Sequence, residues 1–245
     1  MARKDADRKG GGPRYEFKER GWWGACRRAK DRSSHYGDEK IMKQRHYQQY
    51  LARKRKRERE KAFALGWEIA EMANCPIHEC LVPQGLFEQG IGNLVFSRRL
   101  PDGRIALGMF LLDVFCLGVK NAFGTIVSRA KYEERIQDWR GPETFEPMPP
   151  ACLRKLVEGG VAYARELGFN PHLDYAVASR IFGDVDASAC STEFTYGKEG
   201  KPFYCSGPNE TAAQAQAIVE HLARRLGAEG FDYLITMVAP PGESV

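Results

Sequence analysis

The sequence predicts an α+β fold: a mixed or antiparallel sheet with a central hydrophobic strand, several packed helices, and a basic N-terminal arm leading into a long helix. Three observations carry this prediction. Residues 105–117 are apolar at both alternating sets of positions, as in a strand covered on both faces. The C-terminal half alternates helix-length apolar patterns with Gly and Pro. Finally, residues 1–62 hold 21 Lys and Arg against 9 Asp and Glu.

Composition limits the class of protein. The chain has 245 residues, 43% of them hydrophobic, which is enough to bury a core in one large or two small domains. Its longest apolar run, 105–119, is shorter than the about 20 residues of a membrane-spanning helix, so no membrane partner is expected. The N-terminus lacks the apolar segment of a secretory signal, so we expect a cytoplasmic protein, or a nuclear one in a eukaryote, with its seven cysteines reduced.

The chain is expected to divide into three parts. Residues 1–40 are rich in Gly and charged residues without a regular period, which predicts a basic flexible arm. Residues 41–73 lack Pro and become amphipathic toward their end, which predicts a long helix that Pro76 stops. Residues 74–245 form the α+β body, with 140–150 as a candidate boundary between two subdomains.

Turn and cap residues predict the elements of the body. Leu100-Pro-Asp-Gly103 suits a type I turn with a glycine bulge, so residues 94–96 and 105–117 are expected to form a hairpin. The remaining expectations are, in chain order, a helix over 118–138, a helix over 150–167, a helix over 171–182 capped by Asn170, a short hairpin of 194–196 with 203–205, a helix from an Asn209 cap to 226, and a strand over 231–238.

The basic arm carries the clearest functional signal. Lys and Arg release counterions from a phosphate backbone, and interleaved aromatic rings can stack on unpaired bases. The residues we assign to nucleic-acid binding are Trp22, Trp23, Arg27, Arg28, Arg53, Lys54, Arg55, Lys56 and Arg57. RNA or another single strand is preferred, because no duplex-reading motif is recognisable. The sequence thus predicts a nucleic-acid-associated accessory protein; a protein-interaction module whose arm binds an acidic partner is an alternative.

Asp113 is the first candidate for catalysis. A carboxylate on an otherwise apolar strand face costs several kcal/mol unless it is paired or protonated. With Lys120 and Asn121 a short distance along the chain, Asp113 could hold Mg²⁺ or act as a general base. This gives a second alternative, a metal-dependent nuclease or phosphohydrolase. The competing interpretation is a buried acid bonded to backbone donors, to Lys120 or to an arginine.

Cys75, His78 and Cys80 are the candidate metal ligands. Thiolates and imidazole suit tetrahedral Zn²⁺, but the second half of the usual paired motif is missing, so a fourth ligand would have to come from a distant part of the chain, for instance Cys116 or Cys205. If residues 77–82 form a regular strand, His78 and Cys80 share a face and Cys75 lies in the preceding turn. The alternative is that these cysteines are small buried thiols.

Two weaker clusters complete the candidates. The acidic side chains near His172 suit either a divalent cation or helix capping, and they are Asp174, Asp184 and Asp186. Cys190 with His172 is a conceivable nucleophile and base. No P-loop and no Gly-x-Ser-x-Gly motif is present, so the sequence names no enzyme class.

Overall fold

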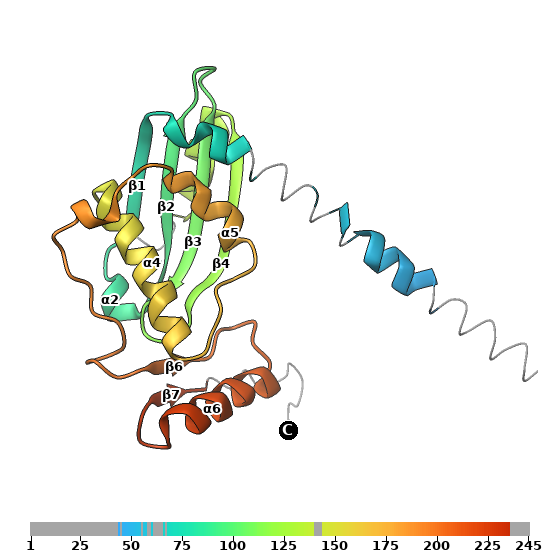
Figure 1. Ribbon diagram of the computed structural model, residues 1–245, viewed down its shortest axis with the longest axis vertical. Helices are drawn as coiled ribbons and strands as arrows, with labels where there is room; N and C mark the ends of the chain where they lie inside the picture. Colours follow the sequence, from blue (N-terminus) through green and yellow to red (C-terminus); the bar gives the residue numbers. More distant parts are fainter. Residues whose placement is uncertain are drawn as a thin grey trace, which may run out of the picture. The chain divides into compact units, whose positions relative to one another are not determined.

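The computed structural model describes residues 44, 46–54, 56–57, 60, 66, 68–139 and 144–235. The chain divides into two compact units, residues 1–58 and residues 59–245. In the first unit, residues 46–54 and 56–57 are helical. The second unit holds the α+β body that the sequence predicts (Figure 1).

A five-stranded antiparallel sheet organises the body, in the order β4-β3-β2-β1-β5. Its strands are β1 (Ile77–Pro83), β2 (Ile91–Arg99), β3 (Ile105–Asp113), β4 (Gly118–Val127) and β5 (Phe145–Pro147). The hairpin of β2 and β3 is confirmed, with Ile91 opposite Asp113 and Arg99 opposite Ile105. Its turn requires Gly103, whose φ of 83° is strained for other residues, and Gly103 N donates to Leu100 O at 3.0 Å.

Helices cover both faces of the sheet, which confirms the interior position expected of β3. On one face α4 (Pro150–Glu166), α5 (Tyr175–Ala178) and η2 (Ser179–Phe182) pack on Phe96 and Phe110 (Figure 1). On the other face α3 (Arg129–Trp139) places Tyr132 and Ile136 against side chains of β1, β2 and β3. Three further short elements are η1 (Met72–Asn74), which precedes β1, α2 (Leu86–Gln89) and η3 (Ala187–Ala189).

A smaller layer lies at one end of the sheet. It consists of α6 (Ala212–Leu226) and the two parallel strands β6 (Phe203–Cys205) and β7 (Asp232–Leu234) (Figure 1). Tyr204, Leu222 and Phe231 bury the inner side of this layer against the connection between β3 and β4 and against the end of α4. The layer therefore belongs to the same unit as the sheet.

The predicted helix over 118–138 is wrong in its first half, where the chain forms β4. Val119, Ala122, Phe123, Ile126 and Val127 do stand at helical spacing, which explains the error. Pairing with β3 from Gly118 to Val127 overrides this pattern, helped by the β-branched residues of the segment. A bulge between Leu111 and Leu112 in the pairing lets both Val119 and Ala122 face the same core.

Other expected boundaries are corrected in the C-terminal half. Residues 194–196 form no strand, because Phe194 stacks on Phe87 and Tyr196 OH donates to Leu156 O at 2.8 Å. The predicted helix over 171–182 begins only at Tyr175 and continues as η2. The N-cap of α6 is Thr211, not Asn209, and it forms a capping box with Gln214. The helix over 150–167 is confirmed as α4, with a proline in its first turn.

Two of the seven cysteines depart from the expected reduced state. Cys152 in α4 and Cys190 after η3 form a disulfide. The neighbouring Lys155 Nζ donates to Cys190 O at 3.2 Å, and Arg154 donates to Gly183 O and Val185 O. The loop that follows η2 is thus held to α4 by a covalent bond and by two basic side chains. Cys75, Cys80, Cys116 and Cys205 are free thiols.

The buried cation of Arg98 joins three parts of the body. Its side chain is 3% exposed and lies over the Phe96 ring. Nε donates to Ile181 O, Nη1 to Cys75 O and Nη2 to Phe182 O, each at 2.7 Å. These carbonyl groups belong to η2 and to the connection between η1 and β1. One side chain of β2 therefore fixes two segments that are distant in sequence.

We expect Arg98→Leu to lower the free energy of unfolding by about 3–5 kcal/mol, because the three carbonyl oxygens lose a charged donor in a buried setting. Chemical denaturation with a far-UV circular dichroism readout measures the change. The adjacent Arg99→Leu is the matched control, since Arg99 is exposed and has only a 3.4 Å contact with His78. A loss at Arg98 no larger than at Arg99 would contradict the anchoring role.

Candidate functional site

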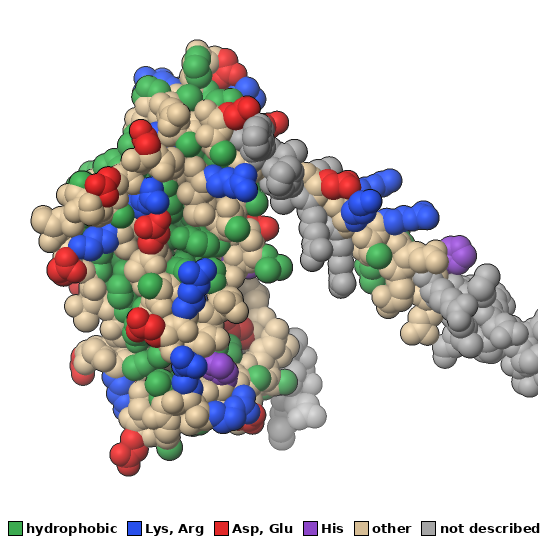
Figure 2. All heavy atoms as spheres, in the orientation of Figure 1, with side chains coloured by type: hydrophobic (Ala, Val, Ile, Leu, Met, Phe, Trp, Pro, Cys, Tyr) green, Lys and Arg blue, Asp and Glu red, His purple; other side chains and the backbone are tan. Residues whose placement is uncertain are grey.

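A stripe of aromatic and basic side chains lies on the helical segment of the first unit. Tyr47, Tyr50, Arg53, Lys54 and Arg57 are all exposed, the two tyrosines by 60% and 61%. At 3.6 residues per turn these five positions fall within about a third of the helix circumference. Figure 2 shows Lys and Arg gathered on this segment, whereas basic and acidic side chains are interspersed on the visible face of the body.

The cations of this stripe are available to a ligand. Among the described residues, Arg53, Lys54 and Arg57 have neither an ion pair nor a hydrogen bond from their side chains. Lys56 is helical and exposed as well, on a neighbouring part of the circumference. Trp22, Trp23, Arg27, Arg28 and Arg55 lie outside the described residues, and their role in nucleic-acid binding stays a prediction.

Tyr47 and Tyr50 are functional candidates that the sequence analysis missed. The adjacent tryptophans and the unbroken basic run are the more conspicuous features of the arm in sequence. The spacing Tyr47, Tyr50, Lys54, Arg57 could have identified them, because steps of three and four residues place side chains on one face of a helix.

Asp113 lies at the end of β3, where the chain turns toward β4. Its side chain is 6% exposed, and Oδ1 accepts the backbone N–H groups of Phe115 and Cys116, both at 2.9 Å. Burial raises the pKa of Asp113 to about 6, although these N–H groups and the charge of Lys120 act in the opposite direction. The backbone N–H groups offset the cost of burying the Asp113 carboxylate. This geometry fits the structural interpretation of Asp113 better than the catalytic one.

Lys120 binds another carboxylate. Its Nζ donates to Glu210 Oε1 at 2.7 Å, and Tyr204 OH donates to Glu210 Oε2 at 2.5 Å. Burial opposes the charge of Glu210, but the hydrogen bonds from Lys120 and Tyr204 bring its pKa below the ordinary value. The triad joins β4 to the layer of β6 and α6. The structure therefore does not bring Asp113 and Lys120 together as a direct catalytic pair, and neighbouring Asn121 is exposed.

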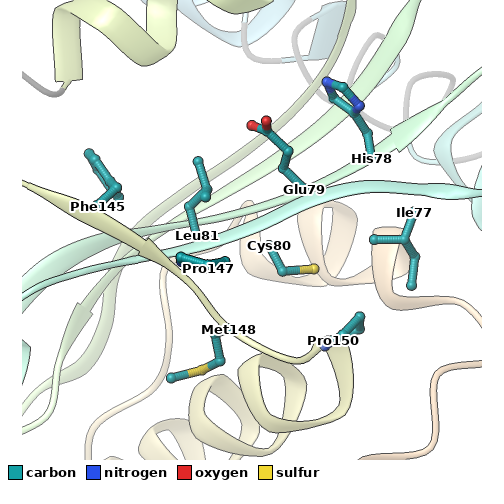
Figure 3. A pocket seen from close by; sticks show the side chains of 9 residues that line it. All are labelled: Ile77, His78, Glu79, Cys80, Leu81, Phe145, Pro147, Met148 and Pro150. Atoms are coloured by element: carbon teal, nitrogen blue, oxygen red, sulfur yellow. The ribbon is translucent and has the colours of Figure 1, made fainter.

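The three candidate zinc ligands do not converge. The pairing of β1 with β2 has a bulge between Ile77 and Glu79, so His78 and Cys80 lie on opposite faces of the sheet rather than sharing one (Figure 3). His78 packs edge-on against Tyr132, while Cys80 faces the core under α4. Burial raises the pKa of Cys80 to about 12, which opposes the thiolate that zinc requires. In the part of the chain that the structure describes, no three Cys, His, Asp or Glu side chains form a metal-binding group.

A shallow hollow of about 420 Å³ lies at this edge of the sheet, where β5 ends and β1 continues alone. Residues 77–81 line it together with Phe145, Pro147, Met148 and Pro150 (Figure 3). Met148 N donates to Cys80 O at 2.9 Å, which closes part of the strand edge within the hollow. Its polar wall consists of His78 and Glu79.

A hydrogen-bonded network beneath Glu79 was also missed from the sequence. Tyr132 OH donates to Glu79 Oε2 at 2.8 Å and lies 3.2 Å from Ser97 Oγ. Ser97 Oγ donates to Glu79 O and accepts from Glu79 N. Ser97 is fully buried, and its hydroxyl bridges β1, β2 and α3. Ser97 and Tyr132 therefore hold α3 on the sheet. The local sequence signal for this role is a serine in an otherwise apolar strand.

The remaining candidates are dispersed. Asp186 caps η3 by accepting from Ser188 N at 2.9 Å, which confirms its capping role. Asp184 lies 3.9 Å from Arg98, and His172 lies 3.9 Å from Asp174, so the acidic side chains form no joint cation site in the described residues. Cys190 is bonded to Cys152 and cannot serve as a free nucleophile with His172 in this state.

Asp113→Asn tests the raised pKa of this carboxyl through the pH dependence of stability. Because the pKa of about 6 in the folded protein exceeds the ordinary 3.8, the stability that Asp113 contributes is lost as pH rises through that window. Asn keeps an acceptor oxygen and does not titrate. We therefore expect the Tm of Asp113→Asn, measured in thermal melts, to rise by a few degrees relative to that of the wild type between pH 4 and pH 7. For a chain of this size, 1 kcal/mol of stability corresponds to about 2–4 °C in Tm.

Asp102→Asn is the control with the opposite sign. The pKa of Asp102 is lowered, mainly by a backbone hydrogen bond from Arg104. The contribution of Asp102 to stability is therefore lost as pH falls. Parallel Tm curves for Asp113→Asn and the wild type at every pH would contradict the raised pKa of Asp113.

The described residues contain no helix with the length and apolarity needed to cross a membrane. The chain matches no protein-family model, no curated protein and no solved structure.

Proposed function

We propose that the protein binds nucleic acid, preferentially RNA or another single strand, through the stripe formed by Tyr47, Tyr50, Arg53, Lys54 and Arg57. The observation that carries the proposal is the stripe itself: exposed cations without ion pairs continue a line of exposed aromatic rings on one helical segment. Cations on such a surface neutralise phosphates, and the rings stack on bases.

The charge distribution supports a polyanionic ligand. Residues 1–62 carry a net charge of +12 from 21 basic and 9 acidic side chains, whereas the rest of the chain is net negative. In the body, exposed cations such as Arg129 and Lys131 are paired with Glu133 and Glu134. The attraction for phosphate is therefore concentrated on the arm and its helix.

The aromatic rings favour single strands over duplexes. A single strand can present the π-faces of its bases to Tyr47 and Tyr50, whereas stacked pairs in a duplex present only their edges. Binding of this kind tolerates different sequences, because every base has a π-face. We therefore propose an accessory function, in which the helix holds a strand, rather than a catalytic one.

The triple variant Arg53→Gln, Lys54→Gln, Arg57→Gln tests the electrostatic part. We expect its affinity for a 20-nucleotide oligouridine, measured by fluorescence anisotropy, to fall more than roughly tenfold at low salt, with the salt slope reduced by about 2, at about 0.7 for each lost phosphate contact. The control Arg129→Gln, Lys131→Gln, Arg224→Gln removes the same charge from the body and should bind like the wild type. Equal losses in both variants would contradict a localised site.

The double variant Tyr47→Ala, Tyr50→Ala tests stacking separately. We expect a loss of about 1–3 kcal/mol for each stacked base, an unchanged salt slope and little effect on duplex binding. The matched control is Tyr233→Ala, which removes an exposed tyrosine of the body. A proportional loss for duplex and single strand would show that the rings do not stack on bases.

A further inference from the structure

The two edges of the five-stranded sheet differ in how they resist pairing with another strand. At one edge, β5 has three residues and ends in Pro147, which has no N–H to donate, and Pro149 and Pro150 follow. Short strands and prolines are the usual protection of an open edge. The opposite edge has neither device.

That opposite edge is β4, a strand of ten residues. Among residues 68–139 and 144–235, one backbone hydrogen bond reaches its outer side. His172 N donates to Val119 O at the beginning of the strand. From Asn121 to Val127 the strand contains no charged residue and no proline. Alternate residues of this segment direct N–H and C=O groups away from β3. A long, uncharged edge of this kind is a template for a further strand.

We propose that β4 pairs in antiparallel fashion with β4 of a second copy of this chain. The two sheets would then join across a twofold axis into one continuous sheet. Such an interface is isologous, the commonest arrangement in soluble homo-oligomers. The proposed contact uses residues of the body alone, so the proposal does not rest on nucleic-acid binding.

The segment is complementary to itself. In the register centred on Gly124, Phe123 of one copy lies opposite Thr125 of the other. The twofold axis produces this pair once on each side of Gly124. Aromatic and β-branched residues form favourable cross-strand pairs. Both residues lie on the face that α3 covers, because Phe123 packs on Trp139 and side chains two positions apart in a strand share a face. The twofold axis keeps the two α3 helices on the same side of the joined sheet.

Charge also favours a second copy over a charged partner strand. In this register Lys120 lies opposite Ser128, and Lys120 is already neutralised by Glu210. No like charges are brought opposite each other along the seven residues from Asn121 to Val127. The half-buried side chains of Phe123 and Thr125 would bury their remaining surface.

The mass of the full-length protein in solution tests the pairing. Sedimentation equilibrium over micromolar concentrations should show a species of twice the 27.6 kDa chain. Thr125→Lys places a charge beside the partner strand and should weaken the dimer by roughly tenfold or more. The control Glu146→Lys puts lysine on the protected edge, at an exposed position of β5, and should leave the mass unchanged.

Circular dichroism shows whether Thr125→Lys remains folded. If it does not, Asn121→Lys replaces it, because Asn121 is exposed and its substitution does not disturb the core. A monomeric wild type overturns the proposal. A folded Thr125→Lys or Asn121→Lys variant that dimerises as strongly as the wild type overturns it as well.

Discussion

The body depends on the burial of one cation. Arg98 sits in β2, and its guanidinium donates to carbonyl groups of η2 and of the connection before β1. Burial lowers the pKa of Arg98, yet the three charge-assisted hydrogen bonds keep the group satisfied. The close approach also needs Gly183, which follows η2 with a φ of 56° and where a Cβ would collide with Ala73 O. Arg98 thus fixes η2 and the connection before β1, which are about a hundred residues apart in sequence, on the same strand.

Much of the fold could be predicted where local signals and tertiary contacts agree. The β2–β3 hairpin has both a defined turn and an apolar strand, and α4 has a proline at its start. The prediction failed over residues 118–127, where apolar residues at helical spacing were paired into the sheet by β3. It also failed for Cys152 and Cys190, because two single cysteines 38 residues apart give no local sign that folding brings them together.

The candidate site was less predictable, because it depends on details that no local pattern encodes. The need to compensate Asp113 could be predicted from its apolar strand, but not which of the candidate partners would do so; in the structure they are the backbone N–H groups of a turn. The zinc hypothesis assumed a regular strand, and one bulge moved His78 to the other face from Cys80. The stripe, by contrast, can be derived from helical periodicity alone. This periodicity places Tyr47 and Tyr50 on the same face of the helix as Arg53, Lys54 and Arg57.

We propose that ligand binding resides in the helical stripe, while the body supplies a stable fold. Ultraviolet cross-linking of the full-length protein to a uridine-rich single strand, followed by mass spectrometry of the cross-linked peptides, tests this division directly. We expect adducts within residues 1–57, with Tyr47 or Tyr50 among the modified positions. Adducts confined to the body, residues 77–234, would contradict it.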